Sequence, residues 1–343
     1  MKLATIHDGS RDGQLAVVSR DLKSVHMADA IAPTLQAALD DWAFIAPQLD
    51  SLYTQLNRGE ARRAFDFEPQ RCMAPLPRAY QKVEGAAYPN HVELVRRTLD
   101  AGLPAQVSAQ LSAHLRDTSS DDPLMHQGGS DDFLGPHDDI LLAHEEWGID
   151  FGAGLAVIVD DVPMGATPDE AHGRIRLLML ANDVSLRQLI PAELAKGAGL
   201  LQSKPATGFS PVAVTPDELG DAWRGGKVHL ALRSTWNGHL VGQPNAGVDM
   251  AFNFPQLIAH LCKSRRARAG TVVGAGTVSN RATGKAKAPA GHGCIAEQRA
   301  LETMADGAPS TPFMRFGDTI RIEMLDEAGK SVCGAIEQTV RKA

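Results

Sequence analysis

Short apolar segments separated by glycine-containing connections constrain this fold more than any other feature of the sequence. They follow one another beyond Pro69, Pro75 and Pro77, and the 343-residue chain holds 32 glycines in all. Segments of about four to eight apolar residues bounded by turn residues are typical of strands, and residues 155–159 are one example. We therefore predict an α+β, β-rich main domain over residues 71–343.

Residues 1–70 have a different pattern and are predicted to form a small N-terminal α+β domain. Residues 3–6 and 15–18 are apolar and partly β-branched, with Asp-Gly turn signals between them. Apolar residues then recur at helical spacing over residues 33–45, and a second amphipathic segment covers residues 46–56.

Turn signals and periodicity place further elements in the main domain. Asn237-Gly238 is a strong hairpin signal, and it is flanked by strand-like residues 228–236 and 239–241. A last hairpin is predicted from residues 320–325 and 331–336. Helices are predicted over residues 90–101, 169–180 and 254–266.

Charge and hydropathy argue against two classes of partner. The formal net charge of −7 is opposite to the basic face that nucleic-acid phosphates require. The dense basic run at residues 263–268 is interpreted as a helix C-terminus, where cations suit the helix dipole. No apolar stretch approaches the ~20 residues needed to cross a bilayer. With four cysteines and no secretory leader pattern, we expect a cytoplasmic protein without a membrane partner.

The common catalytic motifs are incomplete. Residues 274–279 begin like a dinucleotide-binding fingerprint but end in Ser279, and no convincing helix follows. His144-Glu145 opens a zinc-protease motif, but Gly148 replaces its second histidine. The sequence has no Gly-x-Ser-x-Gly nucleophile elbow. These motif classes therefore assign no function.

Several passages, taken in order, resemble the fumarylacetoacetate hydrolase family from about residue 70 to the C-terminus. The first 70 residues also resemble the N-terminal domain of its longer bacterial members. The resemblance implies a mixed, β-roll-like catalytic domain and a homodimer. It also implies hydrolysis of a carbon–carbon bond in a 1,3-diketo acid such as fumarylacetoacetate or an acylpyruvate, in the catabolism of aromatic compounds. The passages are residues 88–95, 128–136, 147–151, 181–185, 204–211, 274–279 and 294–297.

The resemblance also implies roles for single residues. His91 matches the family's general base, and an imidazole can take a proton from water at neutral pH. Glu297 matches the carboxylate that orients this base. Lys204 and the Gly276-Thr277 turn match groups that stabilise the oxyanion and the departing carbanion. Two further residues are implied near the substrate, His126 and Arg187, with a structural salt bridge as the alternative for Arg187.

The metal site departs from the family pattern. Members hold Ca²⁺, Mg²⁺ or Mn²⁺ with carboxylates, and Glu84 and Asp183 match two of the ligands. Gly152 and Gly154 stand where the family usually has a Glu-x-Glu pair. Since these ions take about six to eight oxygens, we expect the divalent cation to bind weakly or not at all. The glycines are expected to open room for a ligand. The alternatives for the missing ligands are Asp150 and His126.

Three hypotheses remain open from the sequence. The first is a hydrolase of a keto acid in which a weak metal, or Lys204 in its place, supplies positive charge. The second is a metal-independent isomerase, decarboxylase or hydratase of a related keto acid. The third is a binding protein with a disabled metal site, which Gly152→Glu and Gly154→Glu together would restore. The first hypothesis is favoured, because the family's catalytic groups are all retained: the dyad of His91 and Glu297, Lys204, and the Gly276-Thr277 turn.

Overall fold

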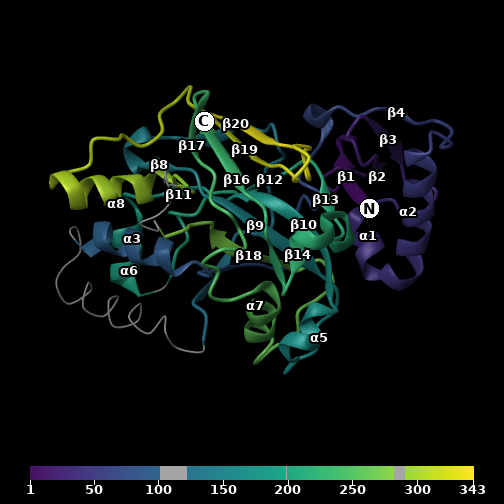
Figure 1. The fold of residues 1–343 in the computed structure, drawn as a ribbon, viewed down its shortest axis with the longest axis horizontal. Coiled ribbons are helices and arrows are strands. Elements are labelled where there is room, and N and C mark those ends of the chain that lie inside the picture. Colours follow the sequence, from purple (N-terminus) through teal and green to yellow (C-terminus); the bar gives the residue numbers. More distant parts are fainter. Residues whose placement is uncertain (101–121, 198, 282–289) are drawn as a thin grey trace.

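A large mixed sheet joins the N-terminal strands to the strands of the main domain (Figure 1). The computed structural model describes residues 1–100, 122–197, 199–281 and 290–343. The strand order is β4-β3-β2-β1-β13-β10-β9-β18-β5-β6, and β12 pairs with β10. The bounds are β1 Lys2–Ile6, β2 Gln14–Val18, β3 Ser24–Met27, β4 Phe65–Asp66, β5 Lys82–Gly85, β6 Met125–Gly128, β9 Ala153–Val159, β10 Ile175–Asn182, β12 Gly208–Phe209, β13 Ala213–Val214 and β18 Val272–Thr277.

A second sheet, of order β17-β16-β19-β20-β7, packs against β9 and β10 of the first. Its bounds are β7 Ile140–Leu142, β16 Leu232–Trp236, β17 His239–Gly242, β19 Thr319–Met324 and β20 Ile336–Lys342. Two small ribbons complete the strands, β8 (Ile149–Asp150) with β11 (Ser185–Leu186) and β14 (Trp223–Arg224) with β15 (Lys227–Val228). The β-rich α+β class is therefore confirmed.

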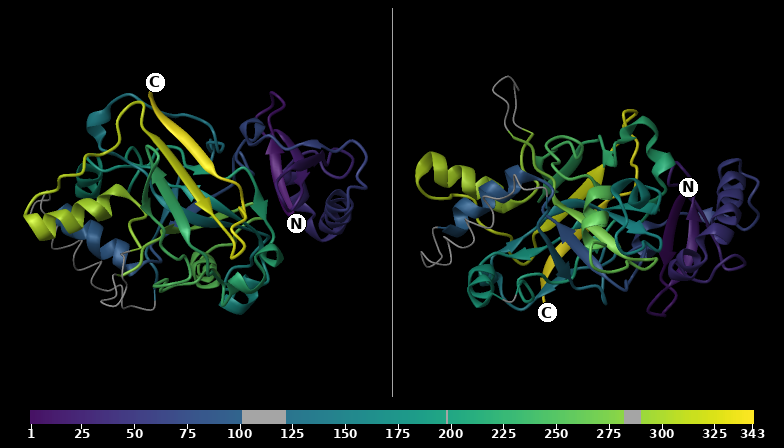
Figure 2. Two further views of the ribbon diagram at one scale, coloured as in Figure 1. Left: turned by 45° about the horizontal axis from the view of Figure 1, so that its top comes forward. Right: turned by 90° about the horizontal axis from the view of Figure 1, so that it is seen from below.

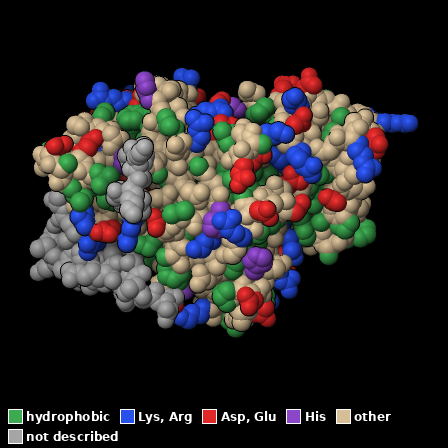
Figure 3. All heavy atoms as spheres, in the orientation of Figure 1, with side chains coloured by type: hydrophobic (Ala, Val, Ile, Leu, Met, Phe, Trp, Pro, Cys, Tyr) green, Lys and Arg blue, Asp and Glu red, His purple; other side chains and the backbone are tan. Residues whose placement is uncertain are grey.

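The α-helices lie at the margins of the sheets (Figure 2). They are α1 Leu35–Asp40, α2 Trp42–Asn57, α3 Pro89–Asp100, α5 Pro168–His172, α6 Ile190–Lys196, α7 Phe254–Leu261 and α8 Ile295–Asp306, with 3₁₀ turns at Pro69–Arg71, Glu145–Trp147 and Pro216–Ala222. No helix in the described part of the chain is long and apolar enough to span a membrane. On the face shown in Figure 3, acidic and basic side chains are interspersed.

The central strands β9 and β10 are buried on both faces. Along β9, Leu155 and Val157 belong to one hydrophobic cluster, while Ala156 and Ile158 belong to the other. Side chains alternate across a strand with period 2, so an unbroken apolar run is required where both faces are covered. The sheet thereby separates the two cores and provides a rigid base for the residues at its edges.

Two hairpins are predicted in the main domain, at residues 237–238 and 326–330. The Asn237-Gly238 hairpin is confirmed, because both residues have positive φ (48° and 79°) and the flanking β16 and β17 pair. Such φ values match the right-handed twist of the paired strands. The last hairpin is also present, because Leu325 bridges Ser331 across the predicted turn, but the continuous strand β20 that pairs with β19 begins only at Ile336.

Three predicted helices differ from the structure. Residues 169–180 form only the short α5 and then enter β10, because a buried apolar run cannot be told from a helix by periodicity alone. The segment at 254–266 ends at Leu261, so the basic run 263–268 is not a helix C-terminus, and Ala267 bridges Val162 instead. The predicted helix 33–45 breaks at Asp41, whose φ of −135° is not helical. The predicted helix 90–101 corresponds to α3, with residue 101 outside the described residues.

Candidate active site

His91 and Glu297 meet although 206 positions separate them in the chain. His91 lies in the first turn of α3 and Glu297 in the first turn of α8, and these helices lie side by side (Figures 1 and 2). Nδ1 of His91 is 2.7 Å from Oε1 of Glu297. The glutamate side chain is 2% exposed and the histidine 18%. Because an ionised carboxylate only accepts, this contact places the proton on Nδ1 and leaves the Nε2 lone pair for another partner.

A buried carboxylate anchors the helix that carries Glu297. The Asp150 oxygens accept the backbone N–H groups of Ile295 at 2.6 Å and Ala296 at 3.1 Å, which start α8. A negative charge at a helix N-terminus is stabilising. Nε of Arg187 donates to the same carboxylate at 2.8 Å. Burial alone would lower the pKa of Arg187, but the charge of Asp150 outweighs it and raises that pKa.

The structure therefore places Arg187 in a buried ion pair with Asp150. This pair supports the dyad of His91 and Glu297 by holding the start of α8. Its side chain is 11% exposed and that of Asp150 is 0% exposed. Asp150 is fully engaged with α8 and Arg187, so its oxygens are not available as replacements for the missing metal ligands.

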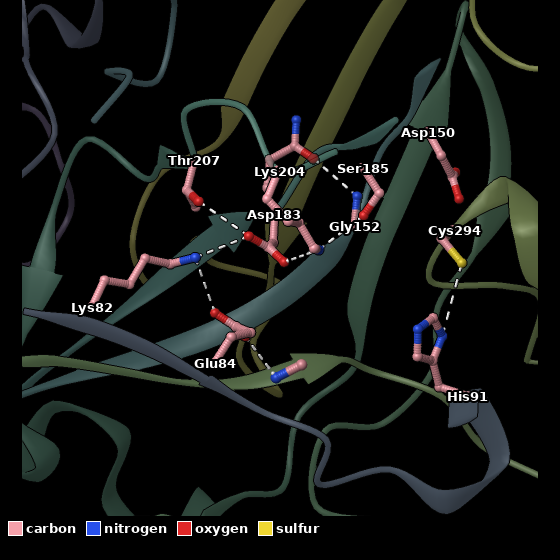
Figure 4. A network of polar contacts seen from close by, with 12 residues as sticks. Lys82, Glu84, His91, Asp150, Gly152, Asp183, Ser185, Lys204, Thr207 and Cys294 are labelled. Atoms are coloured by element: carbon pink, nitrogen blue, oxygen red, sulfur yellow. Dashed lines mark hydrogen bonds and ion pairs between the residues drawn. The ribbon is translucent and has the colours of Figure 1, made fainter. Parts of the chain in front are cut away.

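A second cluster, which we call the lysine–carboxylate network, consists of Lys82, Glu84, Asp183 and Lys204 (Figure 4). Nζ of Lys82 donates to Oδ1 of Asp183 at 2.9 Å and lies 3.3 Å from Oε2 of Glu84. Nζ of Lys204 donates to Oδ2 of Asp183 at 2.5 Å and to Oγ of Ser185 at 2.9 Å. The Lys82 side chain is 2% exposed, whereas that of Lys204 is 15% exposed.

Opposite charges outweigh burial at Lys82 and Asp183, whereas burial prevails at Glu84. Burial alone would lower the pKa of Lys82, but the carboxylates of Asp183 and Glu84 raise it. Burial would likewise raise the pKa of Asp183, but Lys204 and Lys82 hold it well below its usual range. Burial raises the pKa of Glu84.

Lys82 is the residue that sequence analysis missed. It lies on β5 two positions before Glu84, so the two side chains share one face of the strand. A Lys-x-Glu pattern on a strand could have indicated an ion pair there. The partner Asp183, however, is 101 positions away in the chain.

The Gly276-Thr277 turn closes one side of the network. The backbone N–H of Gly276 donates to Oε1 of Glu84 at 2.8 Å, with φ at Gly276 of 84°. A Cβ at this position would lie 2.5 Å from the carbonyl oxygen of Gly85, so glycine is required by both conformation and space. Thr277 continues β18 and pairs with Gly154.

A short path of hydrogen bonds connects the dyad with the network. Oε2 of Glu297 accepts the N–H of Gly293 at 3.2 Å, and the Gly293 carbonyl accepts the N–H of Ala153 at 2.9 Å. The next carbonyl back, that of Gly152, accepts the N–H of Asp183 at 2.8 Å. The structure thus links Glu297 to Asp183 through main-chain hydrogen bonds at the start of β9 and the end of β10.

Two buried polar atoms in this region lack hydrogen-bond partners among the described residues. They are Nε2 of His126 and Oε2 of Glu84, and these two residues are register partners on β6 and β5. Burial lowers the pKa of His126 to about 4, so the imidazole is neutral at pH 7. Oε2 of Glu84 lies 3.3 Å from Nζ of Lys82, so Nε2 of His126 is the atom of the two without an ion-pair contact, and buried polar groups in proteins are nearly always satisfied.

The expectation that Gly152 and Gly154 open room is wrong. A Cβ at 152 would lie 2.5 Å from the carbonyl oxygen of Asp183, and one at 154 would lie 2.9 Å from that of Gly276. Both carbonyls are held close to β9, because the N–H of Asp183 donates to the carbonyl of Gly152 and Thr277, next to Gly276, pairs with Gly154. The glycines therefore have a packing reason, and they leave no space that a ligand could fill.

The residues of the network do not fit the divalent cation that the family pattern implies. Both oxygens of Asp183 already accept hydrogen bonds from ammonium groups, and Glu84 keeps a single oxygen without one. A hard cation needs about six oxygen ligands. Two carboxylates that are already neutralised by two lysines do not supply them.

One other group has metal-like spacing: His91, Cys294 and Glu297 offer ligand atoms within 4.8 Å of one another. The thiol of Cys294 is 3.9 Å from Nδ1 of His91. Burial, followed by the charges of Asp150 and Glu297, raises the pKa of Cys294 well above its usual value. A thiol binds metals as the thiolate, so this group is better described as a hydrogen-bonded dyad with a neutral neighbour.

Two models of known protein families match this chain, one over each of its two parts. The model described as "Fumarylacetoacetase N-terminal domain 2" matches residues 1–78. The model described as "Fumarylacetoacetate (FAA) hydrolase C-terminal" matches residues 83–341. Members and structural neighbours of this family include hydrolases and isomerases that process keto acids.

Individual proteins give more distant likenesses. A curated relative, 2,4-didehydro-3-deoxy-L-rhamnonate hydrolase of Sphingomonas sp. (strain SKA58), is 28% identical over 171 residues, which are 48% of this chain and about half (55%) of that protein. Maleylpyruvate hydrolase of Sphingobium sp. SYK-6, solved with manganese(II) and pyruvate, covers 100% of both chains at 14% identity and a TM-score of 0.64. The 2-hydroxyhepta-2,4-diene-1,7-dioate isomerase of Mycobacterium marinum covers 100% of this chain and 98% of its own at 15% identity and a TM-score of 0.58. These two structures share the fold.

Proposed function

Because this chain belongs to the fumarylacetoacetate hydrolase family, we propose that it hydrolyses a carbon–carbon bond in a 1,3-diketo acid of the fumarylacetoacetate or acylpyruvate type. The observation that carries this proposal is the 2.7 Å contact between His91 and Glu297. It provides an oriented base, and the same close-up view contains the ammonium group of Lys204 (Figure 4). An oriented base and a fixed cation are the minimum set for activating water and stabilising an enolate.

In the proposed reaction, Nε2 of His91 takes a proton from water, and Glu297 stabilises the resulting imidazolium. The hydroxide adds to one carbonyl carbon of the substrate, and the carbon–carbon bond to the neighbouring methylene then breaks. The electron pair of this bond goes to the departing enolate. His91 returns the proton to that carbon, so one water and one diketo acid give two acids.

Lys204 is assigned to the negative charge that develops on oxygen. Its Nζ makes two hydrogen bonds, to Asp183 and Ser185. An ammonium group has three hydrogens, which leaves one for a substrate oxygen. The 15% exposure of this side chain is compatible with such contact.

The proposal is tested by following the loss of diketone ultraviolet absorbance with fumarylacetoacetate and with a short acylpyruvate. Products are identified by mass, with and without excess Mn²⁺ or a chelator. Two product acids from one substrate are expected. Absence of turnover with both substrates under every condition would contradict the assignment. The homodimer stays a prediction that sedimentation velocity can check.

A keto-acid isomerase is the second candidate. His91 and Lys204 suffice to move a proton next to a carbonyl, a reaction that needs no water. Three proteins of the same fold carry isomerase names. In the same assay, a single product with the mass of the substrate would select this reaction.

A further inference from the structure

We infer that the ammonium group of Lys82 takes the place of a divalent cation in this site, so that the centre is complete without a metal ion. The keto-acid ligand in this inference rests on the proposed function. The exclusion of the metal does not, because it follows from the contacts of Lys82, Glu84 and Asp183 themselves.

The first argument is that the carboxylate oxygens are already used. Asp183 accepts from Lys82 at 2.9 Å, from Lys204 at 2.5 Å and from the hydroxyl of Thr207 at 3.1 Å. Oε1 of Glu84 accepts the backbone N–H of Gly276 at 2.8 Å. Only Oε2 of Glu84 is left without a hydrogen bond among the described residues, and it lies 3.3 Å from Nζ of Lys82.

The second argument is electrostatic. Nζ of Lys82 lies between the two carboxylates, where a shared cation would have to bind. A dication at that place would meet the repulsion of two ammonium groups, those of Lys82 and Lys204, within a buried region where such repulsion is poorly screened. The lysine cannot leave easily, because its side chain is 2% exposed and its withdrawal would leave Glu84 without its ammonium partner and Asp183 with Lys204 alone.

The third argument is steric. Further carboxylates cannot be supplied from positions 152 and 154, because a Cβ at either one would meet a backbone carbonyl oxygen at 2.5 or 2.9 Å. The backbone around positions 152 and 154 removes the space for additional acidic ligands. Lys82 supplies the positive charge that those ligands would have held.

The network nevertheless retains groups for an oxygen-rich ligand. Lys204 keeps one ammonium hydrogen, and the buried atoms Oε2 of Glu84 and Nε2 of His126 accept no hydrogen bond from the described residues. An enolisable keto acid offers both acceptors and an enol hydroxyl donor. Direct hydrogen bonds to these three groups would replace chelation by a metal.

The test measures binding of Mn²⁺ alone, by the electron paramagnetic resonance signal of the free ion in the presence of excess full-length protein. For the wild-type chain we expect the signal to keep its full intensity. Lys82→Met, which removes the charge but keeps much of the side-chain volume, is expected to raise the Mn²⁺ affinity by more than ~10-fold. Lys2→Met is the matched control, because Lys2 is also buried but bonds carbonyl oxygens of Ser331 and Val332.

Binding of one Mn²⁺ per wild-type chain would overturn the inference. So would a folded Lys82→Met protein with unchanged affinity, because the ammonium would then not be what excludes the ion. If Lys82→Met does not fold, two measurements still test the inference. The wild type and Lys82→Arg, which keeps the charge, are both expected to bind no Mn²⁺. Failure of the proposed hydrolysis would appear as missing turnover and leave these binding results unchanged.

Discussion

Nε of Arg187 lies 2.8 Å from Oδ2 of Asp150, and this buried pair fixes the start of the helix that carries Glu297. The pair therefore acts on the dyad through the backbone of α8 rather than through a ligand. This arrangement explains how two residues 206 positions apart, His91 and Glu297, are held at hydrogen-bond distance.

Arg187→Met is expected to destabilise the protein by about 3–5 kcal/mol, because it leaves the carboxylate of Asp150 buried without its cation. Urea unfolding measures the loss. Arg176→Met is the control, since the pair of Arg176 with Asp160 is about one-fifth exposed on each side and should contribute less. Equal losses for the two variants would show that the Arg187 pair has no special structural role.

His91→Gln is expected to reduce kcat by about 10²- to 10⁴-fold, the usual effect of removing a general base. Thermal stability should stay near that of the wild type, because His91 is partly exposed. His144→Gln, at an exposed histidine outside the site, is the control and should keep full activity. A His91→Gln enzyme with nearly normal kcat would remove this residue from the mechanism.

Gly152→Ala is expected to destabilise the fold by about 1–3 kcal/mol, because the new methyl group would overlap the carbonyl oxygen of Asp183. Gly173→Ala is the control, since a Cβ there meets its nearest neighbour at 3.6 Å, an ordinary contact. Thermal unfolding compares the two. The same overlap predicts that Gly152→Glu with Gly154→Glu will lower stability instead of restoring a metal site, and a stable variant that binds metal would contradict this.

We predict that Glu302 on α8 contributes to the free energy of unfolding and that this contribution is lost in acid. Burial by itself would raise its pKa, but hydrogen bonds from the backbone and hydroxyl of Thr311 and from Ser310 lower it from 4.5 to about 2. A depressed pKa contributes stability above the unfolded value and loses it as the pH falls through the folded value. The stability difference between wild type and Glu302→Gln, about 1–3 kcal/mol at pH 7, should therefore shrink between about pH 4.5 and pH 2. Chemical denaturation at several pH values measures it, and a difference independent of pH would contradict the assignment.

Local sequence signals were reliable where the structure depends on local chemistry. Asn237-Gly238 specifies its turn, because both residues adopt positive φ at low cost. The strand predicted at 155–159 lies within β9 for a similar reason, being short, apolar and bounded by turn residues. Residues 175–180 were assigned wrongly to a helix, because a strand covered on both faces has no polar alternation to distinguish it from a helix.

The sequence by itself determined the family, the β-rich class, and the candidate residues His91, Glu297, Lys204 and Asp183, because each of these rests on residue identity and order along the chain. Only the tertiary structure decided that Lys82 lies between Glu84 and Asp183, and that Gly152 faces a backbone carbonyl. Ion pairs and close packing depend on distances between segments that are far apart in the chain. Those distances are set by how β5, β9 and β10 assemble in one sheet, and no local pattern encodes them.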